Sequence, residues 1–186
     1  MTTYGIVVEG LYDEAVLLEI IRKCLSNNIE IITRPCGGKD RLMKSFRGFL
    51  DSFQYENKGS PVDKALVIRD AGGKDHDELL EKMRSRIAGR NYTFDVKFII
   101  IVQELETWLL TDEDAISRVT GKTISRVNED LQSIIQPKEK LKKILSDGGV
   151  AYTAEVAKEI ARESDLTKIE YRCPRFKKFC QDVTDC

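Results

Sequence analysis

Two apolar runs in this chain end in an acid, and this arrangement restricts the fold more than any other feature of the sequence. The first run, residues 4–9, closes with Glu9, and the second, Ala65–Ile68, is followed by Arg69 and Asp70. Short, uniformly apolar runs are typical of strands buried on both faces of a parallel sheet. The carboxyl ends of such strands form the edge at which open α/β sheets bind ligands. We therefore expect Glu9 and Asp70 to lie together at a binding edge.

Strand-like runs alternate with helical apolar spacing through the first half of the chain. The predicted strands are residues 4–9, 29–33, 64–69 and 96–102, and the predicted helices between them are residues 13–25, 39–55 and 75–88. This alternation predicts an α/β fold with a parallel sheet of about four strands, joined by right-handed crossovers and covered by helices on both faces.

The pattern changes after residue 103, where only helical segments are predicted. They are residues 105–110, 114–119, 138–145, 153–161 and 175–183. We therefore divide the chain into an α/β part, residues 1–103, and an α-helical C-terminal part, residues 104–186, packed on it.

The charge balance of the 186 residues bears on the partners of the protein. The formal net charge is -1, which argues against a protein that holds nucleic acid by charge alone. Basic residues nevertheless crowd two segments, residues 138–143 and 168–178. These segments are either solvated helix faces or a surface that docks nucleic acid or a protein partner.

The cysteines and the absence of long apolar runs bear on the compartment. The five cysteines are odd in number and form no C-x-x-C pair, so we expect reduced structural thiols and no zinc site. They are Cys24, Cys36, Cys173, Cys180 and Cys186. No apolar run approaches the roughly 20 residues of a membrane span, and no signal-peptide pattern begins the chain. We expect a cytoplasmic protein that does not enter a membrane.

Acids gathered at one sheet edge predict a hard cation, Mg²⁺ or Mn²⁺, and phosphate chemistry. Glu9 and Asp70 are the main candidate metal ligands and catalytic residues, with helix capping as the structural alternative. Glu9 has a second alternative role as general base. Further candidate metal ligands are Asp75 and Asp77, and further candidate acids at the edge are Asp13, Glu104 and Glu106.

A glycine-rich turn follows the second predicted strand. Gly37 and Gly38 permit an anion to approach backbone N–H groups, and Lys39 adds a positive charge. The segment is either a phosphate contact, with Lys39 as a candidate catalytic residue, or a plain turn into the next helix. The full set of candidate substrate-binding residues is Gly10, Gly37, Gly38, Lys39, Arg69 and Lys74.

Two single residues each have two interpretations. Trp108, the only tryptophan, is either a core anchor joining the two parts or a base-stacking platform, and we expect the anchor. His76, the only histidine, is either an exposed residue at a helix start or a metal or acid–base group, and we expect the exposed residue.

The segment Val7–Asp13 resembles the first motif of Toprim domains, a strand ending in Glu-Gly with an acid shortly after it. The segment Ile68–Gly72 falls where Toprim domains carry Asp-x-Asp, although Gly72 replaces the second acid. The segment Val102–Asp112 resembles the E-x-E-x-W-L-L-x-D signature of a small Toprim-like family of bacteria and archaea. Residues 137–139 and 173–179 resemble later motifs of that family.

The resemblance implies a Toprim-like, Rossmann-type sheet in which Glu9 and Asp70 hold Mg²⁺ for phosphoryl transfer, distantly like the nuclease half of OLD-type ATPase-nucleases. It also implies an SMC-type or OLD-type ATPase as a partner. We therefore predict a Mg²⁺-dependent phosphodiesterase, a nuclease acting on nucleic acid, and leave open a homo-oligomer. The alternative is a non-catalytic module that binds an ATPase or nucleic acid. Gly72, which stands in place of the second acid of Asp-x-Asp, favours the non-catalytic module unless Asp75 or Asp77 replaces that acid.

Overall fold

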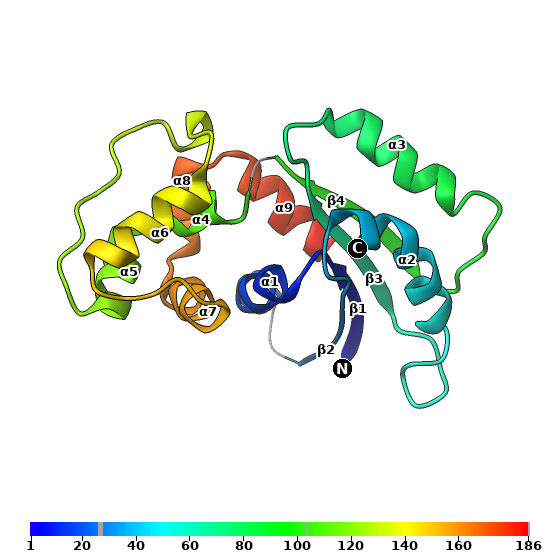
Figure 1. Cartoon of the computed structure of the whole chain (residues 1–186). Coiled ribbons are helices and arrows are strands. Elements are labelled where there is room, and N and C mark those ends of the chain that lie inside the picture. Colours follow the sequence, from blue (N-terminus) through cyan, green and yellow to red (C-terminus); the bar gives the residue numbers. More distant parts are fainter. Residues whose placement is uncertain (26–27, 103, 186) are drawn as a thin grey trace.

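The computed structural model describes residues 1–25, 28–102 and 104–185, and it shows a four-stranded parallel sheet flanked by helices (Figure 1). The strands are β1 (Thr2–Val8), β2 (Ile29–Pro35), β3 (Lys64–Asp70) and β4 (Asp95–Ile101). They lie in the order β2-β1-β3-β4, and all three neighbouring pairs are parallel. The predicted α/β fold with a helical C-terminal part is therefore confirmed.

Different helices cover the two faces of the sheet, because successive strand residues point in opposite directions. Ile6 of β1 packs in one buried cluster with Ile20, whereas Val7 packs in the other with Phe46. The first cluster also holds the C-terminal helices, which lie on the same side as the helix after β1 (Figure 1). The helices that connect the strands are α1 (Leu11–Cys24), α2 (Lys39–Ser52) and α3 (His76–Arg86).

The strand order reverses between β1 and β3. The chain leaves β1 over one face towards β2 and then crosses over to β3 on the other side of β1. The carboxyl ends of two strands at such a reversal flank a natural crevice. Glu9 follows the first of these strands and Asp70 ends the second.

The C-terminal part is helical and contains one helix that the apolar spacing did not predict, α8. Its N-cap residue Asp165 accepts hydrogen bonds from Thr167, and its seven residues are too short to show a clear apolar period. The helices are α4 (Glu106–Leu109), α5 (Glu113–Thr120), α6 (Pro137–Asp147), α7 (Ala154–Glu163), α8 (Leu166–Arg172) and α9 (Arg175–Thr184), with a 3₁₀ turn over Leu131–Ser133. Within the described ranges, no helix is long and apolar enough to cross a membrane.

Trp108 belongs to the buried cluster that contains residues of both the helical part and the sheet, including Ile101 of β4. Its side chain is buried and packs edge-on against Phe176 and at a tilt against Phe179, with ring centroids 4.9 and 4.8 Å away. The expected role of Trp108 as a core anchor is therefore confirmed.

A disulfide joins Cys24 at the end of α1 to Cys180 in α9, with the two Cα atoms 5.6 Å apart. The expectation of reduced thiols is wrong for this pair. The two residues are 156 positions apart in the sequence, and only the packing of α1 on α9 brings them together. Cys36 and Cys173 are free thiols, and Cys186 lies outside the described residues.

Candidate active site

Glu9 is a buried carboxylate at the carboxyl end of β1. Its Oε1 atom accepts a hydrogen bond of 3.0 Å from the backbone N–H of Asp70 and lies 3.8 Å from Nε of Arg69. Burial raises the pKa of Glu9 from 4.5 to about 7, although the charge of Lys39 opposes the rise. With this pKa, the carboxyl group of Glu9 changes between its protonated and charged forms near neutral pH.

Asp70 ends β3 and is as deeply buried as Glu9, each with less than a tenth of its surface exposed. Burial raises the pKa of Asp70 well above its usual range, and the neighbouring acids Asp13, Glu9 and Glu106 raise it further. Two carboxylates that repel each other in a buried place are stabilised by a nearby cation.

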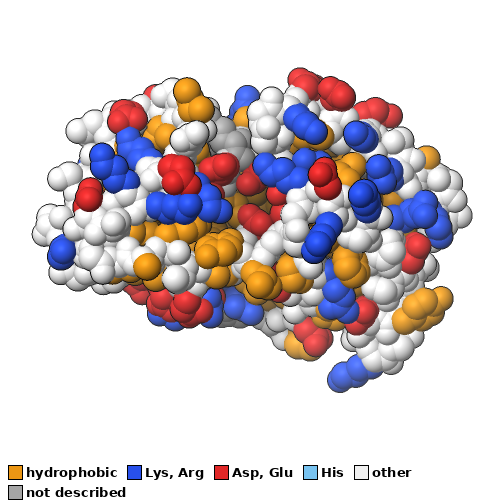
Figure 2. All heavy atoms as spheres, viewed as in Figure 1, with side chains coloured by type: hydrophobic (Ala, Val, Ile, Leu, Met, Phe, Trp, Pro, Cys, Tyr) orange, Lys and Arg blue, Asp and Glu red, His pale blue; other side chains and the backbone are white. Residues whose placement is uncertain are grey.

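Asp13 and Glu106 complete a group of four carboxylates with Glu9 and Asp70, which we call the acid cluster. Asp13 lies in the first turn of α1, and its pKa is raised by burial and by Glu106. Glu106, the first residue of α4, is also buried. Figure 2 shows acidic side chains in the hollow between the two halves of the molecule, with basic side chains on both sides. Asp13 and Glu106 are thus the candidate additional acids that the fold brings to Asp70.

Two residues that sequence reasoning did not single out hold Glu106. The hydroxyl of Tyr152 donates a hydrogen bond of 2.6 Å to its Oε1 atom, and Nζ of Lys138 lies 3.4 Å from the same atom. In the sequence, Lys138 stands out only as part of the basic segment 138–143. Nothing near Tyr152 in the sequence indicates that its hydroxyl contacts Glu106. Both contacts depend on α6 and α7 folding back over α4.

The glycine turn places Lys39 beside the acid cluster. Gly37 and Gly38 both have positive φ angles, and the N–H of Gly38 donates a hydrogen bond of 2.6 Å to the carbonyl of Glu9. A Cβ atom built at Gly72 would lie 2.6 Å from Nζ of Lys39, and Gly72 itself has φ of +57°. The ammonium group of Lys39 therefore occupies the space that a side chain at position 72 would need.

The two other predicted metal ligands, Asp75 and Asp77, and the candidate additional acid Glu104 have local structural contacts. Asp75 is the N-cap of α3 and accepts hydrogen bonds from two backbone N–H groups of its first turn. The Asp77 side chain is 94% exposed and lies 2.9 Å from the ring of His76. Glu104 accepts a hydrogen bond of 3.2 Å from the backbone N–H of Lys138, which fixes the start of α6. The fold brings none of these three acids into the set of charges that most affect Asp70.

The candidate substrate-binding residues lie at different depths. Arg69 is buried, and its Nε atom donates to the carbonyl of Asp70 at 3.3 Å, so this guanidinium supports the acid cluster from within the protein. Gly10 is the extended N-cap of α1. Lys39 and Lys74 are exposed, and these two side chains are accessible to a ligand.

A separate groove with a volume of about 960 Å³ runs along the free edge of β4, between α3 and α9. Its lining includes Asp77 and Glu104, and neither Glu9 nor Asp70. We take the acid cluster as the chemical centre because Glu9, Asp70 and Glu106 are buried and, with Asp13, repel one another at the strand reversal. The groove lies instead at the free edge of β4, and its Asp77 is exposed.

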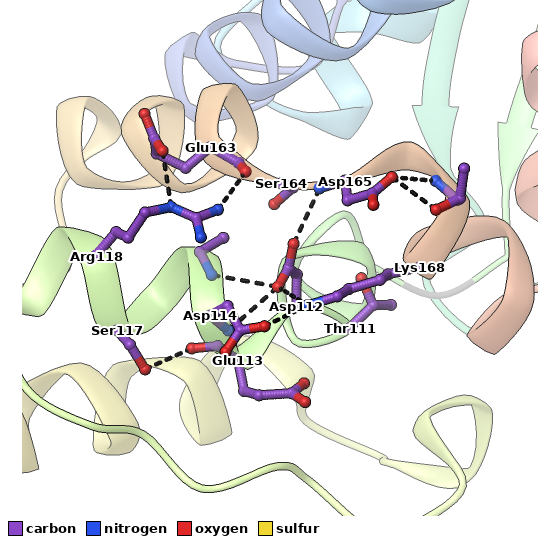
Figure 3. A network of polar contacts seen from close by, with 12 residues as sticks. Thr111, Asp112, Glu113, Asp114, Ser117, Arg118, Glu163, Ser164, Asp165 and Lys168 are labelled. Atoms are coloured by element: carbon purple, nitrogen blue, oxygen red, sulfur yellow. Dashed lines mark hydrogen bonds and ion pairs between the residues drawn. The ribbon is translucent and has the colours of Figure 1, made fainter.

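The acid that ends the W-L-L-x-D segment, Asp112, belongs to a different polar network (Figure 3). Its buried carboxylate caps α5 and accepts hydrogen bonds from the N–H of Asp165 at 2.9 Å and from Nζ of Lys168 at 2.7 Å. Burial alone would raise the pKa of Asp112, but these hydrogen bonds lower it overall. Asp112 therefore joins α5 to the loop between α7 and α8.

The donor set of the acid cluster fits one magnesium-type ion. Within residues 1–25, 28–102 and 104–185, no three His, Cys, Asp or Glu side chains are arranged to hold a single metal ion together. Mg²⁺, however, is usually held by one or two carboxylates, and water or substrate oxygens fill the remaining positions. Glu9 and Asp70 supply two such carboxylates. Burial is the main cause of their raised pKa values, and a bound cation would favour their charged forms.

Comparison with known proteins identifies the family. The model of a family described as "Domain of unknown function (DUF4276)" matches residues 8–184. No match was found among curated proteins or among solved structures. The matched region includes the acid cluster, Lys39 and the whole helical part, so the match concerns the complete arrangement described above. The chain belongs to the DUF4276 family.

Proposed function

We propose that this protein is a Mg²⁺-dependent phosphodiesterase, a nuclease that cleaves nucleic acid at the acid cluster. One observation carries the proposal: four carboxylates from β1, α1, β3 and α4 converge at the strand reversal of a parallel sheet. Sites for phosphate chemistry combine such acids with a divalent cation, which neutralises charge on the phosphoryl group and activates water. The resemblance to Toprim domains supports the same chemistry.

The residues of the site have separate roles in this proposal. Glu9 and Asp70 would hold the metal ion, and Mn²⁺ would bind there as well. With a pKa of about 7 in the absence of metal, Glu9 is also suited to accept a proton from the attacking water. Lys39, whose charge acts on Asp70, and Lys138, whose charge acts on Asp13, would attract and orient a phosphate group.

The resemblance to Toprim-like proteins also carries a proposal about partners. A net charge of -1 gives the protein little general attraction for nucleic acid. An SMC-type or OLD-type ATPase that itself binds nucleic acid would supply that affinity.

Calorimetric titration with Mg²⁺ and Mn²⁺ tests the metal site, with the wild type compared with Glu9→Gln and Asp70→Asn. We expect binding to be lost in both variants and kept in Asp77→Asn, which removes an exposed carboxylate outside the acid cluster. Cleavage of labelled DNA and RNA, with and without the ATPase, then tests the reaction. Metal binding that survives in Asp70→Asn, or that is lost in Asp77→Asn, would contradict the site.

A non-catalytic module is the second candidate function, and one observation favours it. Lys39 fills the space beside Gly72, where Toprim domains carry a further acid. A positive charge fixed at that place partly neutralises Glu9 and Asp70 without a metal ion. This candidate predicts a stable complex with the ATPase or with nucleic acid but no metal-dependent cleavage, and the same assays distinguish the two functions.

A further inference from the structure

A stacked pair of tyrosines stands beside the acid cluster. The rings of Tyr12 and Tyr152 have centroids 5.4 Å apart and are inclined by 20°. Tyr12 lies in the first turn of α1, directly before Asp13, and is 41% exposed. Tyr152 precedes α7 and is partly buried. Tyr152 therefore supports the ring of Tyr12, which is the one presented to solvent.

Contacts to Glu106 and Lys138 fix this pair to the acid cluster. The hydroxyl of Tyr152 donates to Glu106, and burial raises the pKa of Tyr152 so that the hydroxyl stays protonated. Nζ of Lys138 lies 5.2 Å from the ring centroid of Tyr12 and 5.6 Å from that of Tyr152. The same ammonium group is 3.4 Å from Glu106. The aromatic pair thus has a fixed place relative to the carboxylates.

An exposed aromatic ring next to a positive charge is suited to hold an unpaired nucleobase. The ring offers a surface for stacking, and Lys138 attracts the phosphate backbone. Lys39, whose charge acts on both Glu9 and Asp70, is a second positive group that can contact the backbone of the same strand. In a duplex, both faces of a base are covered by its neighbours, so only a single-stranded or unstacked nucleotide presents a free face.

We propose that Tyr12 is a specificity-determining residue that stacks on a base of single-stranded nucleic acid whose phosphate lies at the acid cluster. This proposal rests on the proposed function for the position of the phosphate. Base stacking on Tyr12 does not require cleavage, and it can therefore be tested separately. The chemistry is shared by DNA and RNA.

Fluorescence anisotropy with short labelled oligonucleotides tests the proposal in a Glu9→Gln background, which the proposed function expects to bind no metal ion, so that the strand is not consumed. The probes are single-stranded DNA, RNA of the same sequence, the DNA duplex, and an abasic strand that keeps the phosphates but lacks bases. The variants are Tyr12→Ala, Tyr12→Phe and Tyr171→Ala, because Tyr171 in α8 is a more exposed tyrosine, 81% accessible, and serves as the matched control.

We expect Tyr12→Ala to weaken binding of the base-bearing single strand by about 5- to 100-fold. Tyr12→Phe and Tyr171→Ala should stay within about twofold of the parent, because a phenyl ring still stacks and the control ring is elsewhere. The abasic strand and the duplex should bind weakly, with little response to Tyr12. Comparison of the DNA and RNA arms identifies which single strand is preferred.

Three results would overturn the inference. They are no measurable binding of any single strand, an equal loss for base-bearing and abasic strands in Tyr12→Ala, and a loss in Tyr12→Phe as large as in Tyr12→Ala. The outcome is independent of the proposed cleavage. Binding that depends on Tyr12, without cleavage by the wild type, would reject the nuclease and support base stacking on Tyr12. Cleavage by the wild type with binding that does not depend on Tyr12 would support the nuclease and reject the stacking.

Discussion

The negative charge of Glu9 should cost the metal-free protein stability. Its pKa rises from 4.5 to about 7 on folding, mainly through burial, which corresponds to about 3 kcal/mol of folding free energy. Below about pH 4.5 the carboxyl group is protonated in both folded and unfolded chains. Between about pH 4.5 and 7 the folded chain retains a proton that the unfolded chain releases. This contribution to stability is therefore lost as the pH rises through that window.

Glu9→Gln removes the charge and keeps the shape. The amide oxygen of glutamine can accept the hydrogen bond that the Asp70 N–H donates to Glu9. Near pH 8 and without divalent metal, we expect the variant to be more stable than the wild type by about 1–3 kcal/mol. The lower figure allows for the ion pair with Arg69, which the variant loses. Near pH 4.5 the two proteins should be equally stable.

Urea unfolding followed by the fluorescence of Trp108 measures this difference, at both pH values and in the presence of a chelator. Glu81→Gln, which removes an exposed acid from α3, serves as the control and should show no pH-dependent change. A Glu9→Gln protein that is less stable than the wild type near pH 8, or a difference that is the same at both pH values, would refute the argument. Either result would mean that the buried carboxylate is already well compensated.

Three further changes have defined expectations, each measured by urea unfolding. Asp112→Ala should cost about 2–4 kcal/mol, because it removes the N-cap of α5 and the buried acceptor of the Asp165 N–H, while Lys168 remains solvated; a cost below about 1 kcal/mol would contradict the network. Gly72→Ala should cost about 1–2 kcal/mol because of its positive φ angle, and an unchanged midpoint would show that the turn can rearrange. Reduction of the Cys24–Cys180 disulfide should lower stability by about 2–4 kcal/mol, whereas a Cys24→Ser, Cys180→Ser double variant should not respond to reductant.

The sheet and its binding edge could be predicted because their signals are local. An apolar run followed by an acid is visible within six or seven residues, and both Glu9 and Asp70 lie at the predicted ends of β1 and β3. Helix starts are local signals as well: the helix predicted over residues 75–88 begins at Asp75, and Asp75 is the N-cap of α3.

The rest of the candidate site could not be read from the sequence because it depends on contacts between distant segments. Tyr152 reaches Glu106 across 46 positions in the chain, and Cys180 reaches Cys24 across 156. The proximity of Asp75 to Asp70 in the sequence indicates a shared site. In the structure, however, the carboxylate of Asp75 accepts hydrogen bonds from the N–H groups of Asp77 and Glu78 at the start of α3. A side chain near a site in sequence is often used by its own helix end.

The anchoring of α1 has a mechanical consequence. At its far end, Nζ of Lys23 donates hydrogen bonds to three carbonyl groups at the end of α7, including those of Ala161 and Ser164 at 2.9 and 2.7 Å, and the next residue carries the disulfide to α9. At its near end, about 20 Å away, the same helix carries Tyr12 and Asp13. Because α1 is one continuous helix held to α7 and α9 at its far end, a displacement of that end also moves the other end. Any partner that shifts α7 or α9 against the sheet will displace the tyrosine and the carboxylate together.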